Sequence, residues 1–558
     1  MLKYSELANL YEQLEGISSK HEKTAIIASF LRKVSAEDLD KVVLLLLGRV
    51  FPPWSMEELG FGTQLMIRAI AMATGANERQ IENTYKETGD LGLAAERFVA
   101  KKRQMTLFQQ ALTVDKVIEN LRKVARVEGE GSIDKKIALV AELLTSASPK
   151  EARYVVRTVL EELRIGVAEG IIRDAISLAF NVPVDIVEKA YNLTNDLGFV
   201  AKIAKEKGKD GLQSLKLEPG KPIKVMLAQK VENVKEALEK MGGKVATEIK
   251  YDGARMQIHK RGDEIALFTR RLENVTKQFP DIVDMVRKGI DTEECIIEGE
   301  VVAIDENGKP RPFQMLSRRI KRKYDIEKMV REIPVELNLF DIVYLNGESL
   351  IDVPFEKRRK ILENIAKPYN KLKLAEQLIS DDVQEIEKFY KKALDMGHEG
   401  IMIKNLKAPY KPGSRVGYMV KLKPTMETLD LVIVGAEWGE GKRAHWLSSY
   451  LLACRDPDTG KYLSIGKMGT GLTEDQFREM TERLKPLIIR SEGKFVEIKP
   501  NIVVEVAYEE IQKSPNYESG FALRFPRLIR IREDRGPEDV DTIYRVRRLY
   551  EEQFGKKE

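Results

Sequence analysis

The chain is poor in the residues that build disulfide and zinc frameworks. It has 558 residues, of which only 2 are cysteines and 4 are histidines. Cys295 and Cys454 cannot make a disulfide framework or a four-thiolate zinc site. The histidines show no paired spacing that would suggest metal ligands. The composition therefore argues against a disulfide scaffold and a zinc enzyme, and we expect a reducing, intracellular location.

Long hydrophobic runs are also lacking. The densest apolar run extends from Val42 to Leu47, far short of the roughly 20 residues that span a bilayer. The first residues, MLKYSELANLYEQLEG, lack the apolar stretch of a signal peptide. We therefore predict no membrane segment and place residues 42–47 in a buried helix.

Neither sign of charge dominates. The sequence has 93 Lys and Arg residues against 88 Asp and Glu residues, a net charge of +5. A nucleic-acid-binding face must therefore be local rather than global. Hydrophobic residues make up 43% of the chain, and at about 150 residues per domain the length suggests three or four domains.

The first part of the chain has the period of helices. Leu7, Leu10, Tyr11 and Leu14 recur at i, i+3, i+4 and i+7, which places them on one helix face. Proline and strand-type alternation are rare in this region. We predict an all-α domain over residues 1–218.

The sequence pattern changes from helical to mixed at the proline- and glycine-rich segment 217–222, which we interpret as a linker. We expect an α+β domain over residues 219–424 and a small β-barrel or sandwich over 425–558, for which a five-stranded OB-type barrel has the right size. The predicted strands are 247–250, 254–260, 264–269, 294–304, 335–345, 429–438, 447–455, 461–467 and 502–509, and the predicted helices between them are 355–366 and 383–396.

Lys250 is the candidate nucleophile, because it ends a predicted strand and is followed by Tyr251-Asp252-Gly253. A lysine amine attacks when nearby cations or desolvation keep part of it neutral. The pattern K-x-D-G alone is weak, since it should arise by chance in roughly one chain in seven of this length. A solvated strand end is the alternative interpretation.

Other polar pairs support the same chemistry. Glu298 and Glu300 lie two apart on one strand, either as a solvent-facing pair or as ligands of a hard metal. Glu399 adds a carboxylate beside a glycine. Lys421 and Lys423 also lie two apart, on a polar strand face or against a phosphate.

Taken together, these residues supply what nucleotidyl transfer requires: a nucleophile, carboxylates for Mg²⁺ and cations for phosphate. Phe340 lies on a predicted half-buried strand. It either belongs to the core or stacks on a base.

Seven segments in order then resemble the nucleotidyltransferase motifs of ATP-dependent DNA ligases of the archaeal and eukaryotic replicative type. The segments are EIKYDGAR (248–255), FTRRLENVT (268–276), IIEGEVVA (296–303), LNLFDIVYLNG (337–347), HEGIMIK (398–404), VKLKP (420–424) and RFPRLIRIREDRGPED (524–539). The helical part resembles the DNA-binding domain of that family at LRIGVAEGIIRDAI (163–176) and NDLGFVAKIA (195–204). The resemblance implies a multidomain chain with an all-α N-terminal DNA-binding domain, an α+β adenylation (nucleotidyltransferase) domain and a C-terminal OB-fold β-barrel.

The resemblance also implies roles for individual residues. Lys250 would carry AMP as a phosphoramidate, Glu248 would contact the adenine amino group, and Phe340 would stack on adenine. The remaining matched residues would hold the phosphates, the ribose and the metal. Arg270 would also contact the 5′-phosphate of the nick. Glu300 would contact the ribose or a metal, and Glu399 would help to hold the metal. The others are Arg255, Arg415, Lys421 and Lys423, and, acting on the pyrophosphate leaving group, Arg532, Asp534 and Arg535.

Two positions depart from the pattern of the family. Met419 stands where a tryptophan is frequent, and Arg535 stands where the last motif usually has lysine. Arginine keeps the charge but has a different geometry. We expect any effect of Arg535 in the self-adenylation step.

The implied cofactors are ATP and Mg²⁺, and the implied partner is nicked duplex DNA, bound without sequence readout and in a salt-dependent way.

The glycine-rich turns 129–132 and 166–170 are either phosphate-binding sites or ordinary helix starts. The basic run 318–323 is either a solvated helix face or a DNA-facing patch. Gln104 to Phe108 resembles a shortened sliding-clamp-binding peptide, or is a basic loop with a docked aromatic. We expect a monomer that acts in DNA replication, repair and recombination.

Related chemistries remain as alternatives. An RNA ligase or an mRNA-capping guanylyltransferase would not carry the large helical N-terminal domain. An NAD⁺-dependent DNA ligase would carry a four-cysteine zinc module. A non-catalytic DNA-binding clamp accessory would not need Lys250, Glu300, Glu399, Lys421 and Lys423 intact. The sequence leaves open whether ADP or other nucleotides also serve as donors.

Overall fold

The computed structural model describes residues 2–55, 57–101, 111–129, 131–322, 324–424, 427–439 and 445–553. The chain divides into two compact units. One comprises Met1–Lys230, Ala237–Asp381 and Met402–Val420, and the other comprises Val231–Glu236, Asp382–Ile401 and Lys421–Glu558. The segment Gln104–Phe108, predicted as a clamp-binding peptide, lies outside the described residues.

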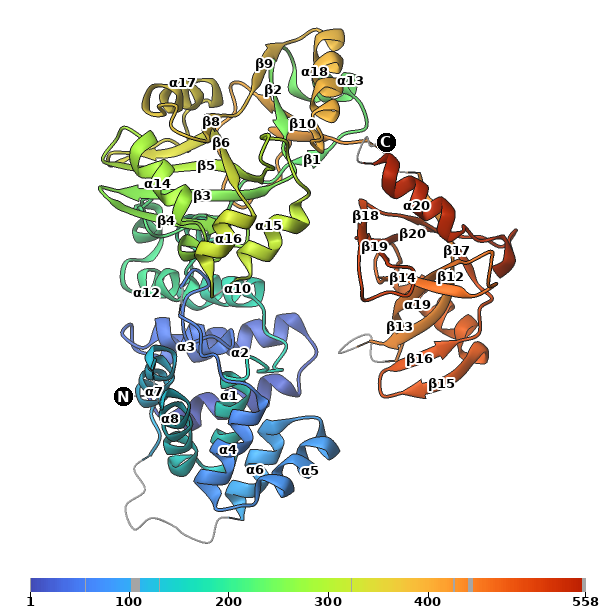
Figure 1. Cartoon of the computed structure of the whole chain (residues 1–558). Coiled ribbons are helices and arrows are strands. Elements are labelled where there is room, and N and C mark those ends of the chain that lie inside the picture. Colours follow the sequence, from blue (N-terminus) through green and yellow to red (C-terminus); the bar gives the residue numbers. More distant parts are fainter. Residues whose placement is uncertain are drawn as a thin grey trace. The chain divides into compact units, whose positions relative to one another are not determined.

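The N-terminal region is helical, as the 3.6-residue period predicts (Figure 1, blue to cyan). Its core includes Leu7, Tyr11 and Leu14, all fully buried. The apolar run at 42–47 lies in α3 and its C-cap; residues 42–46 are buried and Leu47 is partly buried. The helices are α1 (Tyr4–Glu15), α2 (Lys20–Lys33), α3 (Leu39–Leu46), α4 (Thr63–Thr74), α5 (Glu78–Thr88), α6 (Leu91–Ala100), α7 (Val114–Arg126), α8 (Ser132–Ser146), α9 (Pro149–Val159), α10 (Glu169–Phe180), α11 (Val184–Thr194) and α12 (Leu197–Gln213).

Side-chain caps and glycines begin several of these helices. Ser148 and Glu151 form a capping box at α9, and the Asp90 side chain accepts from the first amides of α6. Gly131 adopts a left-handed φ of 71° immediately before α8, a conformation that glycine reaches without a steric penalty. Helices begin at both glycine-rich turns, at Ser132 and Glu169, as either interpretation of these turns requires.

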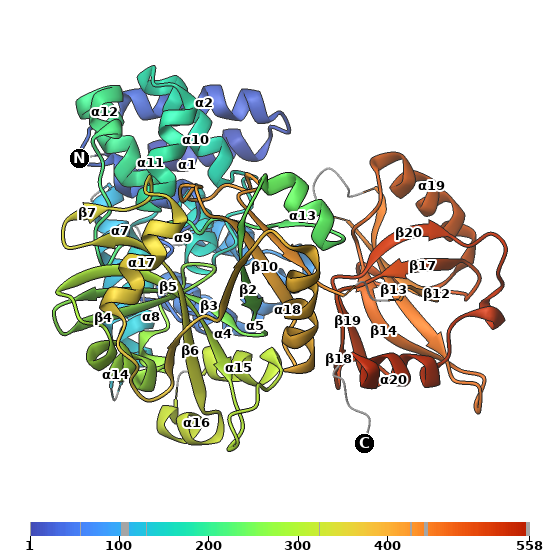
Figure 2. The ribbon, with the colours of Figure 1, turned by 90° about the horizontal axis from the view of Figure 1, so that it is seen from above.

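Two sheets follow. Within the described residues, a six-stranded sheet has the order β4-β3-β5-β6-β7, with β8 paired to β6, and a five-stranded sheet has the order β1-β11-β10-β2-β9. Figure 2 shows β3, β5 and β6 side by side. The strands are β1 (Gln229–Lys230), β2 (Val245–Lys250), β3 (Ala254–Arg261), β4 (Glu264–Thr269), β5 (Glu294–Ala303), β6 (Val335–Leu345), β7 (Glu348–Ser349), β8 (Leu372–Leu374), β9 (Gln377–Ser380), β10 (Gly400–Asn405) and β11 (Met419–Leu422).

The connections contain the helices that the sequence predicts, together with shorter ones. The Asn346-Gly347 turn joins β6 to β7, with a positive φ at both residues, as the dipeptide predicts. The helical elements are α13 (Val234–Met241), η1 (Thr276–Gln278), α14 (Pro280–Gly289), α15 (Phe313–Ile320), α16 (Ile326–Glu332), α17 (Phe355–Ile365) and α18 (Val383–Asp395).

The C-terminal region is rich in strands, which confirms the predicted class. Its described strands form a seven-stranded sheet of order β14-β13-β12-β16-β15, with β17 joining β12 to β20, and a β18-β19 hairpin. The predicted OB-type barrel fits this arrangement. The elements are β12 (Leu429–Trp438), β13 (Leu447–Arg455), β14 (Tyr462–Met468), α19 (Glu474–Leu484), η3 (Lys485–Leu487), β15 (Ile488–Glu492), β16 (Phe495–Ile498), β17 (Val503–Ala507), β18 (Glu510–Lys513), β19 (Phe521–Arg524), β20 (Arg527–Ile531), η4 (Pro537–Asp539) and α20 (Ile543–Glu552).

In the part of the chain that the structure describes, none of the helices has both the length and the apolar character needed to cross a bilayer.

Candidate active site

The turn that follows Lys250 is seated on the neighbouring sheet. Lys250 is the last residue of β2 and is partly exposed. The Asp252 carboxylate accepts a hydrogen bond from the Phe313 amide at 3.1 Å. A Cβ placed on Gly253 would lie 2.3 Å from the Val301 carbonyl oxygen and 3.0 Å from Glu300 Cγ. Only glycine permits this approach, which places the turn beside Glu300.

Glu248 is a buried carboxylate on the same strand as Lys250. It is 2% exposed, and Lys404 Nζ lies 2.5 Å from its Oε2. Gln377 Nε2 donates to its Oε1 at 2.9 Å, and an Arg359 nitrogen lies 3.6 Å away. Sequence reasoning missed Lys404 and Arg359. Lys404 belongs to the quoted HEGIMIK segment, whereas nothing in the sequence singles out Arg359.

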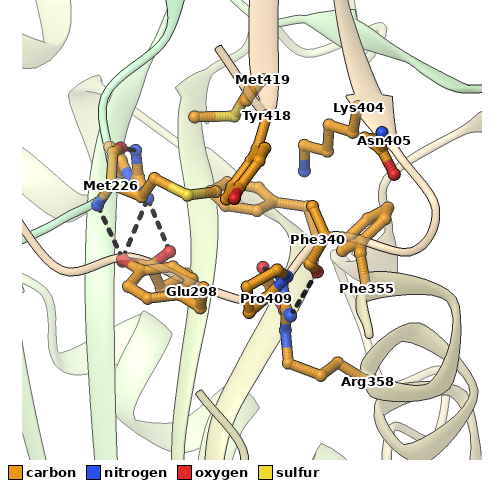
Figure 3. Close-up of a pocket in the computed structure, with 14 residues that line it drawn as sticks. Met226, Glu298, Phe340, Phe355, Arg358, Lys404, Asn405, Pro409, Tyr418 and Met419 are labelled. Carbon is orange, nitrogen blue, oxygen red and sulfur yellow. Dashed lines mark hydrogen bonds and ion pairs between the residues drawn. The ribbon is translucent and has the colours of Figure 1, made fainter. Parts of the chain in front are cut away.

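Phe340 lines a pocket and is partly exposed, so it is not a core residue. Lys404 Nζ lies 4.5 Å from the centre of its ring, and the Arg255 guanidinium carbon lies 5.5 Å from it. In Figure 3 the Met226 side chain points toward the Phe340 ring, and Tyr418 lies beside it. The structure thus places the Phe340 ring at the edge of a pocket, between two cationic side chains.

Arg255 and Glu298 form a buried ion pair at the same pocket. Arg255 Nη2 donates to Glu298 Oε2 at 2.6 Å, and Nη1 donates to the Met226 carbonyl oxygen at 2.9 Å. Tyr410 donates its hydroxyl to Glu298 Oε1 at 2.9 Å. Burial opposes the charge of Arg255, but Glu298 overcomes it and raises the pKa of Arg255.

This pairing corrects one sequence interpretation. The solvent-facing alternative is wrong for Glu298, whose side chain is fully buried and whose two oxygens serve Arg255 and Tyr410. Glu300, two residues on, is partly exposed and lies opposite Arg255 in the β3–β5 register. The two carboxylates thus have different environments.

The second unit holds Glu399, Lys421 and Lys423. Lys421 lies on β11, but Lys423 is one residue beyond the end of that strand. Lys423 Nζ lies 2.9 Å from Glu399 and 3.6 Å from Glu509. Burial lowers the pKa of Lys423, but the two carboxylates outweigh burial and raise it. Of the predicted pair, Lys423 is thus held between two carboxylates.

Gly400 brings the chain segments around this pair together. Its φ is +144°, and a Cβ on it would lie 2.2 Å from the Leu422 carbonyl oxygen. Both features require glycine at this position. Glu399 and Lys423 meet because the backbones on either side of them are in contact.

The remaining predicted residues lie near strand ends. Arg270 directly follows β4 and is exposed, and Arg415 is exposed between β10 and β11. Arg532 and Arg535 both bind the Asp430 carboxylate, at 2.8 Å and 2.7 Å. Arg532 also pairs with Asp534 at 2.8 Å. The sequence had not singled out Asp430.

The basic run at 318–323 is not uniformly a solvent face. Arg319 is fully buried, pairs with Asp281 and lies 4.5 Å above the Phe279 ring. Arg318, Lys321 and Arg322 are exposed. The interpretation as a basic surface therefore fails at Arg319, because that side chain serves the core.

Comparisons with known proteins agree over nearly the whole chain. The model of the DNA ligase N terminus matches residues 3–177, that of the ATP dependent DNA ligase domain matches 225–423, and that of the ATP dependent DNA ligase C terminal region matches 443–535. A DNA ligase of Thermococcus onnurineus is 53% identical over 550 residues, which cover 99% of this chain and 98% of the relative. A DNA ligase of Archaeoglobus fulgidus is 49% identical over 552 residues, covering 99% of each chain.

A solved structure shares the fold. The structure named Pmar-Lig_PreS3 aligns with a TM-score of 0.55 at 17% identity, covering 94% of this chain and 99% of that chain. At that identity the likeness supports the fold alone. The family models and the relatives go further, and by them the chain belongs to the ATP-dependent DNA ligase family.

Proposed function

We propose that this ligase seals nicks in duplex DNA through an AMP group carried on Lys250. The observation that carries the proposal is the position of Lys250 in the structure. It ends β2 in a partly exposed position, and the turn after it packs on β5 beside Glu300. A lysine at an accessible strand end, next to a carboxylate on a rigid sheet, is placed for attack on a bound phosphate.

The reaction has three in-line displacements. Lys250 Nζ attacks the α-phosphorus of ATP, and pyrophosphate leaves. The AMP group passes from Lys250 to the 5′-phosphate of the nick. The 3′-hydroxyl then attacks that phosphate, AMP leaves, and the phosphodiester bond is formed.

The nucleotide would be held by residues of the first unit. Phe340 would stack on adenine, and Glu248 would accept a hydrogen bond from its amino group. Among the described residues, Arg255 Nε has no hydrogen-bond partner although it is buried, so it is available to donate to the ribose or phosphates. Arg270 and Arg415, both exposed, would contact phosphates of DNA and ATP.

Mg²⁺ would be held jointly by protein and substrate. Among the described residues, no three His, Cys, Asp or Glu side chains cluster as a metal cage. Mg²⁺ is usually bound by one or two carboxylates together with phosphates and water, and the partly exposed Glu300 and Glu399 fit that role. The ion would neutralise charge on the transferred phosphate.

The second unit would contribute cations. Lys421 and Lys423 would contact phosphates, and Arg532, Asp534 and Arg535 would orient the pyrophosphate during self-adenylation. Asp430 holds both arginines before that step.

We also propose boundaries and partners. The three domains would be 1–218, 219–424 and 425–558. The protein would act as an intracellular monomer in DNA replication, repair and recombination, and Gln104–Phe108 would bind a sliding clamp.

The test is transfer of label from [α-³²P]ATP in Mg²⁺, followed on a denaturing gel. Wild type should become labelled and should lose the label to nicked duplex DNA. Lys250→Ala should not become labelled. Lys244→Ala, which removes an exposed lysine just before β2, should behave as wild type. A label that survives in Lys250→Ala, or no label in folded wild-type protein that mass spectrometry shows to be free of AMP, would contradict the proposal.

A further inference from the structure

Strand β3 carries three polar side chains at alternate positions. Arg255, Gln257 and His259 share one face of the strand, because side chains alternate along it. Gln257 and His259 are each 1% exposed. The motifs account for Arg255 alone, and the buried side chains of Gln257 and His259 require hydrogen-bond partners.

Their partner is the extended segment 220–226, here called the strap, which links the helical region to the sheets. The Gln257 side-chain amide bonds both polar groups of Ile223: the Ile223 N–H donates to Oε1 at 2.9 Å, and Nε2 donates to the Ile223 carbonyl at 3.1 Å. The Gly220 N–H donates to His259 Nδ1 at 2.9 Å. The strap therefore lies on the polar face of β3 as a docked chain.

The network fixes the tautomer of His259. Because Nδ1 accepts from Gly220, the proton must be on Nε2, which donates to Gln257 Oε1 at 2.9 Å. Burial lowers the pKa of His259 to about 3, so the ring stays neutral and keeps its acceptor. Gln257 and His259 thus act as one bonded pair.

The strap ends at the nucleotide pocket. Met226 lines that pocket with Phe340 (Figure 3). Its N–H donates to the Tyr410 hydroxyl at 3.0 Å, and its carbonyl accepts from Arg255 Nη1 at 2.9 Å. With Nη2 on Glu298, two bonds fix the plane of the guanidinium. That plane sets the direction of the Nε–H, the donor without a partner among the described residues.

The opposite side of the strap is also anchored. The Lys224 N–H donates to the Asn192 carbonyl at 2.9 Å, and Lys224 Nζ lies 3.8 Å from the centre of the Tyr191 ring. Ile223 therefore bonds to the sheet, while its neighbour Lys224 contacts the helices. The position of the strap is determined from both sides.

We propose that Gln257 and His259 are positioning residues of the nucleotide site, which hold the strap so that Met226 directs the Arg255 Nε–H toward the ribose and phosphates of ATP. This inference rests on the function proposed above, because it takes the Lys250 region as the ATP site. Neither residue touches the nucleotide. They act through the strap and through Arg255.

The test measures self-adenylation rate against ATP concentration. Gln257→Met keeps the length of the side chain and removes its hydrogen bonds. His259→Phe keeps a ring against Phe268, whose centre is 4.9 Å away, and removes both nitrogens. We expect each variant to raise the half-saturating ATP concentration about tenfold and to change the limiting rate less than threefold, since the nucleophile is untouched.

A double-variant cycle separates positioning from a direct role. Arg255→Lys keeps a cation for Glu298 but has no Nε–H. If Gln257 acts through Arg255, the double variant Gln257→Met/Arg255→Lys should need no more ATP than Arg255→Lys alone. Independent, multiplying effects of the two substitutions would overturn the proposal.

Thr481→Val is the matched control. Thr481 is buried in the C-terminal region, and its Oγ1 accepts a hydrogen bond from the Leu447 amide at 2.9 Å. This variant should lower the melting temperature without changing the ATP dependence. If Gln257→Met and His259→Phe behave in the same way, their role is only structural and the inference fails. Absence of labelling in the wild type would instead refute the proposed function.

Discussion

Two arginines in this ligase, the buried Arg157 and the mostly buried Arg255, differ in how many of their nitrogens donate hydrogen bonds. Arg157, in the helical region, donates from Nε, Nη1 and Nη2 to the carboxylates of Asp90 and Glu15, at 2.6–3.2 Å. Arg255, in the central region, donates to one carboxylate, one backbone carbonyl and, at 3.4 Å, the Tyr410 hydroxyl, and its Nε has no partner among the described residues. Each of the three guanidinium nitrogens of Arg157 donates to a carboxylate, and the side chain joins helices together. Arg255, which lines a pocket, keeps an Nε–H for which the described residues offer no acceptor.

Burial alone therefore does not mark a functional site. Both arginines neutralise carboxylates that are almost completely buried, Asp90 and Glu298. Breaking such a pair by removing one partner costs about 3–5 kcal/mol, because the other charge stays buried and unpaired. The two sites differ in what else reaches them: a pocket with an aromatic ring at Arg255, and packed helices at Arg157.

The largest expected effect breaks the comparison directly. Arg157→Met should destabilise the protein by about 3–5 kcal/mol, yet at a temperature where it stays folded its ATP dependence in self-adenylation should match wild type. Arg255→Met should lose comparable stability and also most of its self-adenylation. Denaturant unfolding and label transfer measure the two quantities. If both variants lost self-adenylation to the same extent, the hydrogen bonding of the arginine would not distinguish a ligand-binding site from a structural one.

Next in size is the steric requirement beside Lys250. Gly253→Ala places a Cβ 2.3 Å from the Val301 oxygen, so the turn must move away from β5. We expect the self-adenylation rate to fall about 100-fold, as an ångström-scale misplacement does elsewhere. Gly62→Ala is the control, since nothing lies within 4 Å of a Cβ there. An unchanged rate in Gly253→Ala would show that the close packing of this turn on β5 does not affect self-adenylation.

The smallest effect concerns the charge of His259. Its pKa in the folded state is lowered to about 3 by burial, against about 6.5 when unfolded. The stability that comes from keeping the ring neutral is complete above pH 6.5 and is lost as the pH falls toward 3. Between pH 7 and 5 the wild type should lose about 2 kcal/mol from this group, and His259→Phe should not. Denaturant midpoints at pH 7 and pH 5 test this, and parallel losses in both proteins would contradict it.

Local sequence patterns predicted much of the secondary structure. The spans 264–269, 335–345, 429–438 and 447–455 are the strands β4, β6, β12 and β13 with the same bounds. Alternation, β-branched residues and Asn-Gly turns act over a few residues, so they can be read without knowing the fold. The motifs around Lys250 were recognisable for the same reason.

Local patterns did not predict which charged side chains pair with one another. Glu298 was one of two equivalent carboxylates in the sequence, and only the β3–β5 pairing shows that it belongs to Arg255 while Glu300 stays partly exposed. No sequence pattern marked Asp430, although it binds both Arg532 and Arg535. Arg532 lies 102 residues further along the chain. Gln257 and His259 looked like ordinary residues of a strand.

The sequence by itself determined the order of the domains, most strand and helix bounds, the candidate nucleophile Lys250 and the family resemblance, because each depends on residues close together in the chain. The tertiary structure decided which charges neutralise one another, which arginine keeps a donor, and where the strap is docked. Those outcomes depend on sheet register and on contacts between residues 29 to 184 positions apart. Local patterns do not encode such contacts, since the same polar side chain can be solvated or buried according to what folds against it.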